Sequence, residues 1–507
     1  MHTDEHGWRE QLVYCLVINR TLRQEANVDS RISGAVRRWL IVLGIFIVPA
    51  YIACRPSTIT DPDIWWHIRT GEWILQNHAV PRLDPFSVAA SPWVAYSWAF
   101  DLLANLFFRR WHLAGLLALT IVLTLVVSAA LWALVRRTQP DFVKAAALTI
   151  AALVAMSPLY APRPWMFSIA LFAVQLKLLL ATRDDGNWRR LLWLPPLYAV
   201  LANIHVQFVY ALMVLGLAAL APSVQAWLPG RTDASADRWR VSARSLWILV
   251  AVCAAATLIN PYGWEIYRVI AHYASGRVEL QYVAEMHPMS FREPSHFAVV
   301  GLLLVACYTL GRRRAGDPFL FMLLVVSCAL SFRSVRDIWV VVLTSAAIVA
   351  SALPGAARGD RVFFWQTAAA MLAAAGFVAI APRQPGMRGP LDRTVAATYP
   401  VEAVRVIRER GLEGPLLNYP DWGGFLIEFL PGIPVQVDGR TNVHRADRLE
   451  RSIATWNAAP GWRSDPEFLR ARLVIGSPAF PLCQLLLADP HFTLAYQDEV
   501  AYVFTRR

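Results

Sequence analysis

Charged residues are scarce in this 507-residue chain, where Asp, Glu, Lys and Arg together make up 17% of the sequence. A soluble globular protein has about 25% charged and roughly 45–50% apolar residues. This chain is 56% hydrophobic, with a mean hydropathy of +0.41. One soluble core cannot hide such an excess, so the composition indicates a bilayer protein, in which helices satisfy their own backbone groups.

The sequence also lacks the usual marks of a disulfide framework, a repeat protein or a secreted protein. Its six cysteines are scattered, without a pairing pattern or metal-ligand spacing. No internal repeat is visible, and no apolar stretch with a cleavage site precedes residue 39. We therefore expect residues 1–38 to be a cytosolic N-terminal leader. The net charge of +12 sits mostly in short segments between apolar runs, which argues against a nucleic-acid partner.

Apolar runs take up most of the first three quarters of the chain, and a spanning helix needs roughly 20 such residues. Arginine clusters fall on every second segment between the runs, as at 136–137 and 312–314. Because Lys and Arg concentrate in cytoplasmic loops, this alternation predicts a multi-pass protein of the inner (plasma) membrane with a cytoplasmic N-terminus and an extracytoplasmic tail. The predicted spans lie near 39–54, 113–135, 143–160, 165–182, 191–204, 207–228, 245–260, 296–310, 317–331, 337–353 and 363–382.

We therefore predict an all-α polytopic membrane protein with about eleven transmembrane helices and a small C-terminal α/β soluble domain. The transmembrane domain is expected over 39–382 and the extracytoplasmic domain over 383–507. Asp438-Gly439-Arg440 is typical of a turn after a strand, with a binding role as the alternative. The tail is expected to contain a helix at 400–410, short strands at Leu416–Asn418, Val435–Val437 and Leu473–Ile475, and a hairpin of 492–497 with 500–505.

The expected first external loop, residues 55–112, is rich in acidic and aromatic side chains. Pro62 suits the start of a helix over about 62–76, and Asp61 suits its N-cap. Trp66 has two interpretations. It is either an anchor at the membrane interface or an aromatic platform for a sugar.

A helix over this part of the loop would place Asp63, His67 and Thr70 on one side, by their spacing of four and three residues. We therefore expect His67 to take part in catalysis, by orienting Asp63 or by bridging it to a donor phosphate. Asp63 is either a first-turn carboxylate favoured by the helix dipole or a general base. The second interpretation gains support because a carboxylate beside the membrane is easily given a shifted pKa.

Three arginines fall in short turns on the expected outer side, against the general distribution of positive charge: Arg163, Arg333 and Arg336. They either bind a phosphate, for which the guanidinium fork is well suited, or extend to outer lipid headgroups. Asn203 and His205 lie in a polar turn at the end of a span. They either cap two helices or face the same site as the arginines.

The first-loop residues also carry a resemblance. The pattern Asp61-Pro62-Asp63-x-Trp65-Trp66-His67, followed by Asp84-Pro85-Phe86-Ser87, is similar to a bacterial family of multispanning proteins. This family is grouped with the GT-C glycosyltransferases, near the dolichyl-phosphate-mannose protein mannosyltransferase-like enzymes. Further matching pieces are Asn203-x-His205, Asn260-Pro261-Tyr262-Gly263-Trp264, Arg333 with Arg336, Trp422-Gly423-Gly424 and Asp438-Gly439-Arg440.

The resemblance implies a polyprenyl-phosphate sugar donor, an extracytoplasmic glycan, lipid or protein acceptor, and an acidic first-loop residue that activates the acceptor or holds a divalent metal such as Mg or Mn. That residue would be Asp63 or Asp61, because the adjacent Asp-Glu pair common in these enzymes is here Asp61-Pro62-Asp63. The expected reaction is inverting transfer of a hexosyl or pentosyl group. Two non-enzymatic alternatives remain: a transporter or flippase for lipid-linked glycans, and an inactive scaffold for envelope assembly.

Overall fold

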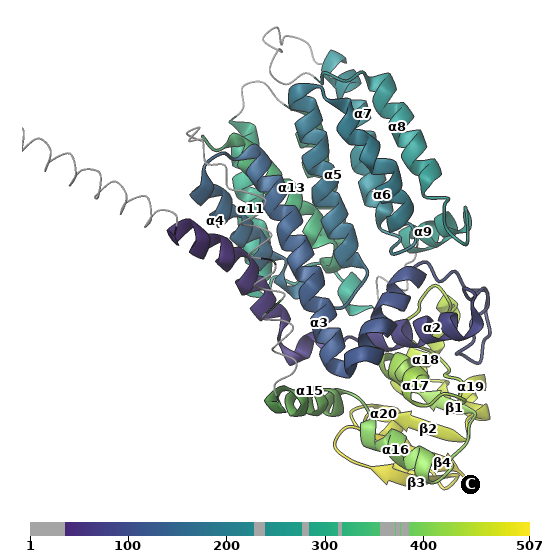
Figure 1. Ribbon diagram of the computed structural model, residues 1–507. Coiled ribbons are helices and arrows are strands. Elements are labelled where there is room, and N and C mark those ends of the chain that lie inside the picture. The colour runs from purple at the N-terminus through teal and green to yellow at the C-terminus, as the bar shows by residue number, and fades with distance from the viewer. Residues whose placement is uncertain are drawn as a thin grey trace, which may run out of the picture.

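The computed structural model describes residues 36–227, 239–275, 283–312, 317–354, 371, 376 and 385–507. Long apolar helices pack side by side into a bundle, and a smaller α/β domain lies beyond one end of it (Figure 1). The bundle helices are Val36–Ala53, α3 (Trp98–Thr138), α4 (Phe142–Ala155), α5 (Trp165–Asp185), α6 (Leu194–Leu201), α7 (Phe208–Trp227), α8 (Ala243–Ala256), α11 (Pro294–Gly311), α12 (Pro318–Arg333) and α13 (Ile338–Ala352).

Six of the described helices are long and apolar enough to cross a membrane: Val36–Ala53, α3, α5, α7, α11 and the stretch Val335–Ala352 that contains α13. Three shorter apolar helices, α4, α8 and α12, lie among them. Every predicted run from 39–54 to 337–353 falls on a helix, and the run 363–382 lies almost entirely outside the described residues. The prediction of a polytopic helical membrane protein is thus confirmed.

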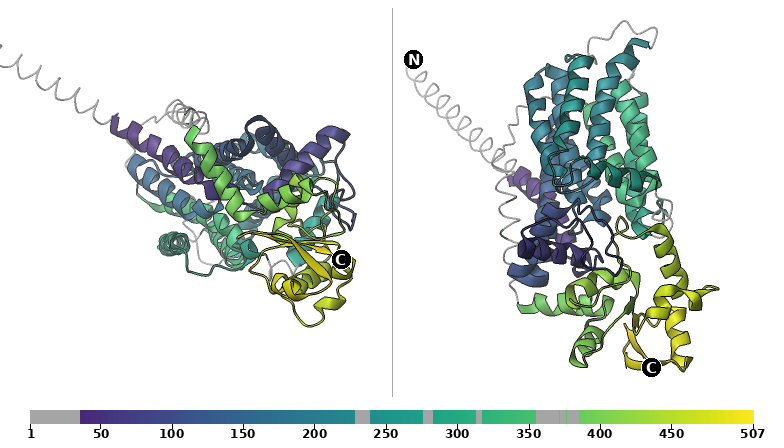
Figure 2. Two further views of the ribbon diagram at one scale, coloured as in Figure 1. Left: turned by 90° about the horizontal axis from the view of Figure 1, so that it is seen from below. Right: turned by 90° about the vertical axis from the view of Figure 1, so that its right-hand side faces the viewer.

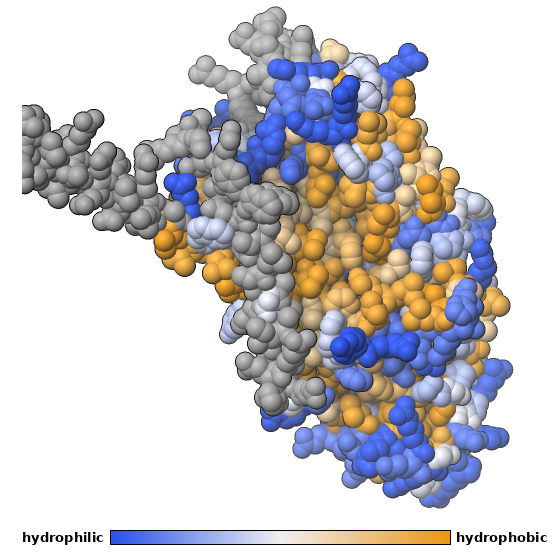
Figure 3. Space-filling model, viewed as in Figure 1, coloured by the Kyte–Doolittle hydropathy of each residue, from blue (hydrophilic) through white to orange (hydrophobic). Residues whose placement is uncertain are grey.

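The surface of the bundle matches this interpretation. Apolar side chains form a broad band across the middle of the molecule, and hydrophilic side chains gather at its two ends (Figure 3). The exposed large apolar residues of the bundle helices include Trp247 and Ile248 of α8 and Leu304 of α11. Large apolar surfaces of this kind mark contact with lipid or with a partner.

The first loop (residues 55–112) folds against the end of the bundle. It contains α2 (Ile64–Asn77), which packs on the first part of α3. The helix α3 bends sharply at His112, where φ is 51° and ψ is −136°. The predicted helix therefore exists but begins at Ile64, two residues later than expected, and the Asp61 carboxylate does not cap it. Instead Asp61 Oδ1 accepts a hydrogen bond from the Asp63 backbone N–H, at 2.9 Å.

The C-terminal domain holds a four-stranded sheet in the order β1-β2-β4-β3. Strands β1 and β2 are parallel, and the other two pairs are antiparallel. The predicted helix, the strands predicted at Leu416–Asn418 and Leu473–Ile475, and the predicted hairpin are confirmed. The elements are α15 (Pro385–Thr398), α16 (Val401–Glu409), β1 (Leu416–Asn418), α17 (Gly423–Phe429), α18 (Ala446–Trp456), α19 (Pro466–Arg470), β2 (Leu473–Gly476), α20 (Pro481–Ala488), β3 (Phe492–Gln497) and β4 (Tyr502–Arg506).

The strand predicted at Val435–Val437 does not join this sheet, so that prediction is wrong. Val435 instead pairs with the first loop, forming an isolated parallel bridge with Ser87. Its N–H donates to the Phe86 carbonyl at 3.1 Å, and its carbonyl accepts from the Val88 N–H at 3.0 Å. The first loop and the C-terminal domain are thus joined through their backbones.

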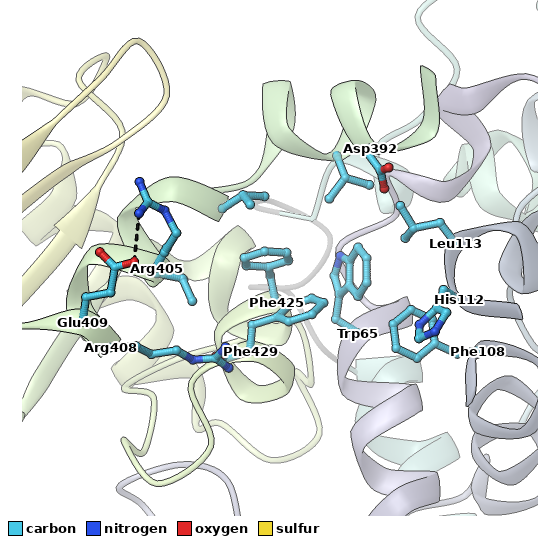
Figure 4. Close-up of a pocket in the computed structure, with 13 residues that line it drawn as sticks. Trp65, Phe108, His112, Leu113, Asp392, Arg405, Arg408, Glu409, Phe425 and Phe429 are labelled. Atoms are coloured by element: carbon cyan, nitrogen blue, oxygen red, sulfur yellow. Dashed lines mark hydrogen bonds and ion pairs between the residues drawn. The ribbon is translucent and has the colours of Figure 1, made fainter. Parts of the chain in front are cut away.

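An apolar contact strengthens the same junction. The fully buried Trp65 of α2 meets the rings of Phe425 and Phe429 of α17, each at 5.4 Å between centroids. Beside it lies a cavity of about 670 Å³ between α2, the bend of α3 and helices α15 to α17 (Figure 4). The views of Figure 2 place the C-terminal domain at one end of the bundle. The first loop is therefore enclosed between the two domains.

Candidate functional site

One arginine ties the first loop to the bundle. Arg163 precedes α5, and its side chain is 9% exposed. Its Nε donates to Asp61 Oδ2, and one terminal nitrogen donates to Asp63 Oδ2. The other terminal nitrogen lies 3.5 Å from Glu285 Oε2. A single guanidinium thus gathers three carboxylates from two separate loops.

A second arginine reaches the same carboxylate from the opposite side. Arg336 lies in the 3-10 turn before α13, and its terminal nitrogen is 3.6 Å from Glu285 Oε1. The loop of Glu285 is fixed to this turn, because its carbonyl accepts from the Ser334 hydroxyl at 3.2 Å. Arg333 points elsewhere: it is exposed and donates to the Ala274 carbonyl at 3.1 Å. Of the three predicted arginines, Arg163 and Arg336 therefore converge.

Burial controls the acidity of the two first-loop carboxylates. It raises the pKa of Asp63, the positive charge of Arg163 lowers it, and the charges of Asp61 and Glu285 raise it again, to about 6. Burial likewise raises the pKa of Asp61 against the opposing charge of Arg163. A carboxyl group with a pKa near 6 is suited to accept a proton around neutral pH.

The His67 side chain does not pair with the Asp63 carboxylate, and these two residues share only a backbone hydrogen bond, from the His67 N–H to the Asp63 carbonyl at 3.2 Å. The His67 Nδ1 shares a hydrogen bond of 2.6 Å with the buried Asp101 of α3, which also accepts from the Ser97 hydroxyl at 3.1 Å. Burial and the charge of Arg163 hold the pKa of His67 well below its usual value. Trp66 lies over this ring at 3.6 Å between centroids and is 6% exposed. As placed, both side chains join α2 to its neighbours.

The polar turn predicted near His205 divides between two environments. His205 Nδ1 lies 2.9 Å from the Ser168 hydroxyl of α5, and burial with the charges of Arg336 and Arg163 lowers its pKa. His205 thus lies within the electrostatic reach of the arginine pair. Asn203 is engaged in the turn: it accepts from the Trp98 indole at 2.9 Å and donates to two backbone carbonyls, at 2.7 Å each.

The C-terminal domain also reaches the site, through residues 438–444. Gly439 lies directly against the Asp63 carboxylate: a methyl group at this glycine would overlap Asp63 Oδ1 and lie 3.1 Å from its Cγ. The Thr441 hydroxyl is 3.4 Å from the Tyr273 hydroxyl, which in turn is 3.5 Å from that of Tyr96. These hydroxyl groups form a polar wall beside the carboxylates.

Sequence reasoning missed the two tyrosines and treated Gly439 as part of a turn. The tyrosines carried no motif, because their partners lie 177 and 168 residues away along the chain. The available signal was the Asp438-Gly439-Arg440 motif itself. This motif and the first-loop motif both belong to the resemblance described above. Their spacing in the chain could not show that the two motifs are in contact.

The carboxylates of Asp61, Asp63 and Glu285 are the hard oxygen donors that Mg²⁺ and Mn²⁺ prefer. They meet at one point, but the guanidinium of Arg163 takes that point. Within the described ranges, no group of three or more His, Cys, Asp or Glu side chains is arranged to hold a metal ion. As arranged, the three carboxylates pair with Arg163, so a metal ion would have to displace that side chain. The expectation of Mg or Mn therefore stays a prediction.

Comparison with known proteins gives the fold a context. No family model and no curated protein matches the sequence. The chain is similar to the oligosaccharyltransferase of Archaeoglobus fulgidus tethered with an acceptor peptide, at 13% identity and a TM-score of 0.50, covering 86% of this chain and 69% of that one. The same archaeal enzyme, AglB, in complex with an inhibitory peptide and a dolichol-phosphate gives a TM-score of 0.48 with the same identity and coverage.

A bacterial structure also aligns, over a greater length but less closely. It is ArnT from Cupriavidus metallidurans bound to undecaprenyl phosphate, at 13% identity and a TM-score of 0.28, covering 93% of this chain and 98% of that one. At such low identity a likeness shows architecture and not activity. The likeness to the archaeal oligosaccharyltransferase is one of fold, and the bundle with its C-terminal sheet is consistent with the GT-C-like resemblance of the sequence.

Proposed function

We propose that this protein is a membrane glycosyltransferase that moves a sugar from a polyprenyl-phosphate donor to an acceptor outside the cytoplasm, with Asp63 as the base. The observation that carries the proposal is the buried pairing of Asp61 and Asp63 with Arg163. The candidate site lies beside α2, between the helical bundle and the C-terminal domain (Figure 1). A lipid carrier would reach the site there from the bilayer.

The arginine pair is suited to the donor phosphate. Arg163 and Arg336 approach Glu285 at 3.5 and 3.6 Å, both longer than the charge-assisted contacts of roughly 2.7–2.9 Å. These loosely held N–H groups can turn to a phosphate oxygen. Bound phosphate would also share the positive charge of Arg163, so the pKa of Asp63 would rise and its carboxylate would become a stronger base.

The reaction assigned to this geometry is inverting transfer. Asp63 takes the proton of the acceptor hydroxyl as the acceptor oxygen forms a bond to the anomeric carbon. The bond from that carbon to the phosphate oxygen breaks, and its electron pair leaves with the polyprenyl phosphate. Positive groups near the leaving phosphate stabilise the charge that develops there, and this is the role of Arg163 and Arg336.

The first experiment measures transfer in purified membranes with a panel of labelled polyprenyl-phosphate sugars and the Asp63→Asn variant. Asn keeps the size of the side chain but cannot accept the proton, so we expect a loss of about 10²–10⁴-fold. Asp61→Asn should lose less, because it leaves the base in place. Thermal unfolding of each variant checks the fold, and full activity in Asp63→Asn would contradict the assignment.

The second experiment follows the donor carrier, by native mass spectrometry of protein purified with added undecaprenyl phosphate. Arg336→Gln should retain much less of this lipid than the wild type. Arg405→Gln is the matched control, because that exposed arginine pairs only with Glu402 and Glu409 among the described contacts. Measuring transfer with EDTA and then with added Mn²⁺ tests the implied metal separately.

These two experiments also separate the alternatives. A transporter or flippase would bind the carrier and move it across vesicle membranes. It would form no glycosylated product, either as the wild type or as Asp63→Asn. A scaffold without catalysis would show neither transfer nor transport. Product formation that depends on Asp63 distinguishes the enzyme from both.

A further inference from the structure

The base proposed above lies beneath the C-terminal domain, and the contact is unusually close. The two oxygens of the Asp63 carboxylate have different neighbours: Oδ2 binds Arg163, and Oδ1 lies against the backbone of Gly439. No side chain fits between Gly439 and this carboxylate, since even a methyl group would overlap Oδ1. The position of Asp63 is therefore set from two sides, by the bundle and by the C-terminal domain.

A buried ionic clamp fixes residues 438–444 at this position. Arg440 is 1% exposed and binds both oxygens of Asp438, at 2.8 and 2.6 Å. Its remaining terminal nitrogen donates to Asp84 of the first loop, at 2.7 Å. The guanidinium carbon also lies 4.7 Å from the centre of the Trp93 ring. Two guanidinium nitrogens thus bind Asp438 within the C-terminal domain, and the third joins that domain to the first loop.

Two further contacts join the C-terminal domain to the first loop near this clamp. Asn442 donates to the Val94 carbonyl at 3.1 Å. At Gly424 an added methyl group would lie 2.5 Å from the Pro62 carbonyl oxygen. The C-terminal domain therefore presses two glycines, Gly424 and Gly439, against consecutive residues of the first loop.

We propose that residues 438–444 are a positioning element of the active site, which holds the Asp63 carboxylate in the orientation that catalysis needs. This inference rests on the proposed function and deepens it. Gly439 positions the base by direct contact, and Arg440 positions Gly439 by anchoring it to Asp84. Neither residue exchanges a proton with the substrate. The C-terminal domain is then a part of the catalytic apparatus and not an appended module.

The direct test is Gly439→Ala in the full-length protein, in the same transfer assay. A displacement of about 1 Å in a catalytic group can reduce a rate about 10²-fold. We therefore expect kcat to fall by about this factor while the KM for the polyprenyl-phosphate donor changes less than about twofold. Gly389→Ala is the matched control, because nothing lies within 4 Å of the position of its new methyl group. Unchanged kcat in Gly439→Ala would overturn the proposal.

A second readout does not depend on activity. A water-soluble carbodiimide labels accessible carboxyl groups, and peptide mass spectrometry reports the labelled fraction at Asp63. We expect Gly439→Ala to change this fraction and Gly389→Ala to leave it unaltered. If the wild type transfers no sugar, the proposed function fails, and this labelling still shows whether Gly439 holds Asp63.

If Gly439→Ala does not fold, Asp84→Asn replaces it. That variant adds no atoms near Asp63. It weakens the anchor of Arg440 and also the local turn in which Asp84 accepts from the Phe86 and Ser87 N–H groups. Lower kcat with retained donor KM, or altered labelling of Asp63, supports the positioning role. Wild-type values for both would overturn it.

Discussion

The carboxyl group of Asp63 is buried beside Asp61, Glu285 and Arg163. Its pKa of about 6 reflects burial first and the opposing charge of Arg163 second. The folded protein therefore holds this proton more tightly than the unfolded chain, whose Asp has a pKa of 3.8. The contribution of this group to stability is complete below pH 3.8 and is lost as the pH rises through about 6.

The transfer activity should rise with pH, in the opposite direction to the stability contribution of Asp63. Transfer needs the ionised form of Asp63, so we expect kcat/KM, which reports the protein without bound donor, to rise between pH 5 and pH 7 with its midpoint near 6. Asp61→Asn removes a negative charge that raises the pKa of Asp63, so the midpoint should move to lower pH in that variant. Initial rates across this range provide the measurement, and a flat profile in the wild type would argue against Asp63 as the base.

For individual residues, the sequence identified Asp63, His67 and Arg163 as site candidates but did not identify the side chains that they contact. Helical spacing placed Asp63 and His67 on one side, yet the structure pairs His67 with Asp101. The reason is that α3 packs on α2 and brings a second buried carboxylate to the histidine. Arg163 stood out because it lies on the expected outer side. Its first-loop partners, Asp61 and Asp63, lie 102 and 100 residues away in the chain, so sequence spacing could not identify them.

Among the elements, the contact of α2 with α3 depends on a glycine. Gly71 lies so close to α3 that a methyl group there would overlap the Asp101 carbonyl oxygen and lie 2.7 Å from the Asn105 Cβ. Asn105 in turn donates to the Ile68 carbonyl at 3.0 Å. The small residue therefore allows two helices to approach at the base of the site.

Gly71→Ala should push these helices apart. Overpacking of a well-filled contact typically costs about 1–3 kcal/mol, so we expect a lower unfolding temperature in detergent, together with reduced transfer. Gly389→Ala on α15 is the control, because its surroundings are open. An unfolding temperature equal to that of the wild type in Gly71→Ala would show that α2 and α3 can move apart without loss of stability.

The elements themselves were largely predictable, because apolar runs and charge alternation are local properties. The spans, α16, β1, β2 and the hairpin all follow their sequence patterns. Val435–Val437 was not predictable in the same way. Its apolar, β-branched residues favour an extended backbone, but its hydrogen-bond partners belong to the first loop. A pattern predicts extension and does not identify the neighbouring strand.

For the whole molecule, the test is which end of the bundle faces outward. The C-terminal sheet lies beyond one end (Figure 1), and α5 begins at Trp165, just after Arg163, at that end and runs to Asp185 at the other. In a background without the six native cysteines, Glu499→Cys should react with a membrane-impermeant thiol reagent added outside intact cells. Asn187→Cys should react only after the membrane is disrupted. The reversed result would place the site in the cytoplasm and remove the proposed access to an extracytoplasmic acceptor.

The ion pair between Asp84 and Arg440 joins residues 356 positions apart in the chain. A ribosome adds about 5–20 residues per second, so the first loop waits on the order of 20–70 s for its partner to be made. During that time Asp63 has been synthesised, but the segment that presses on it has not. The order of synthesis therefore delays completion of the site until nearly the last part of the chain has emerged. We expect a chain that ends before residue 440 to insert its helices and remain inert.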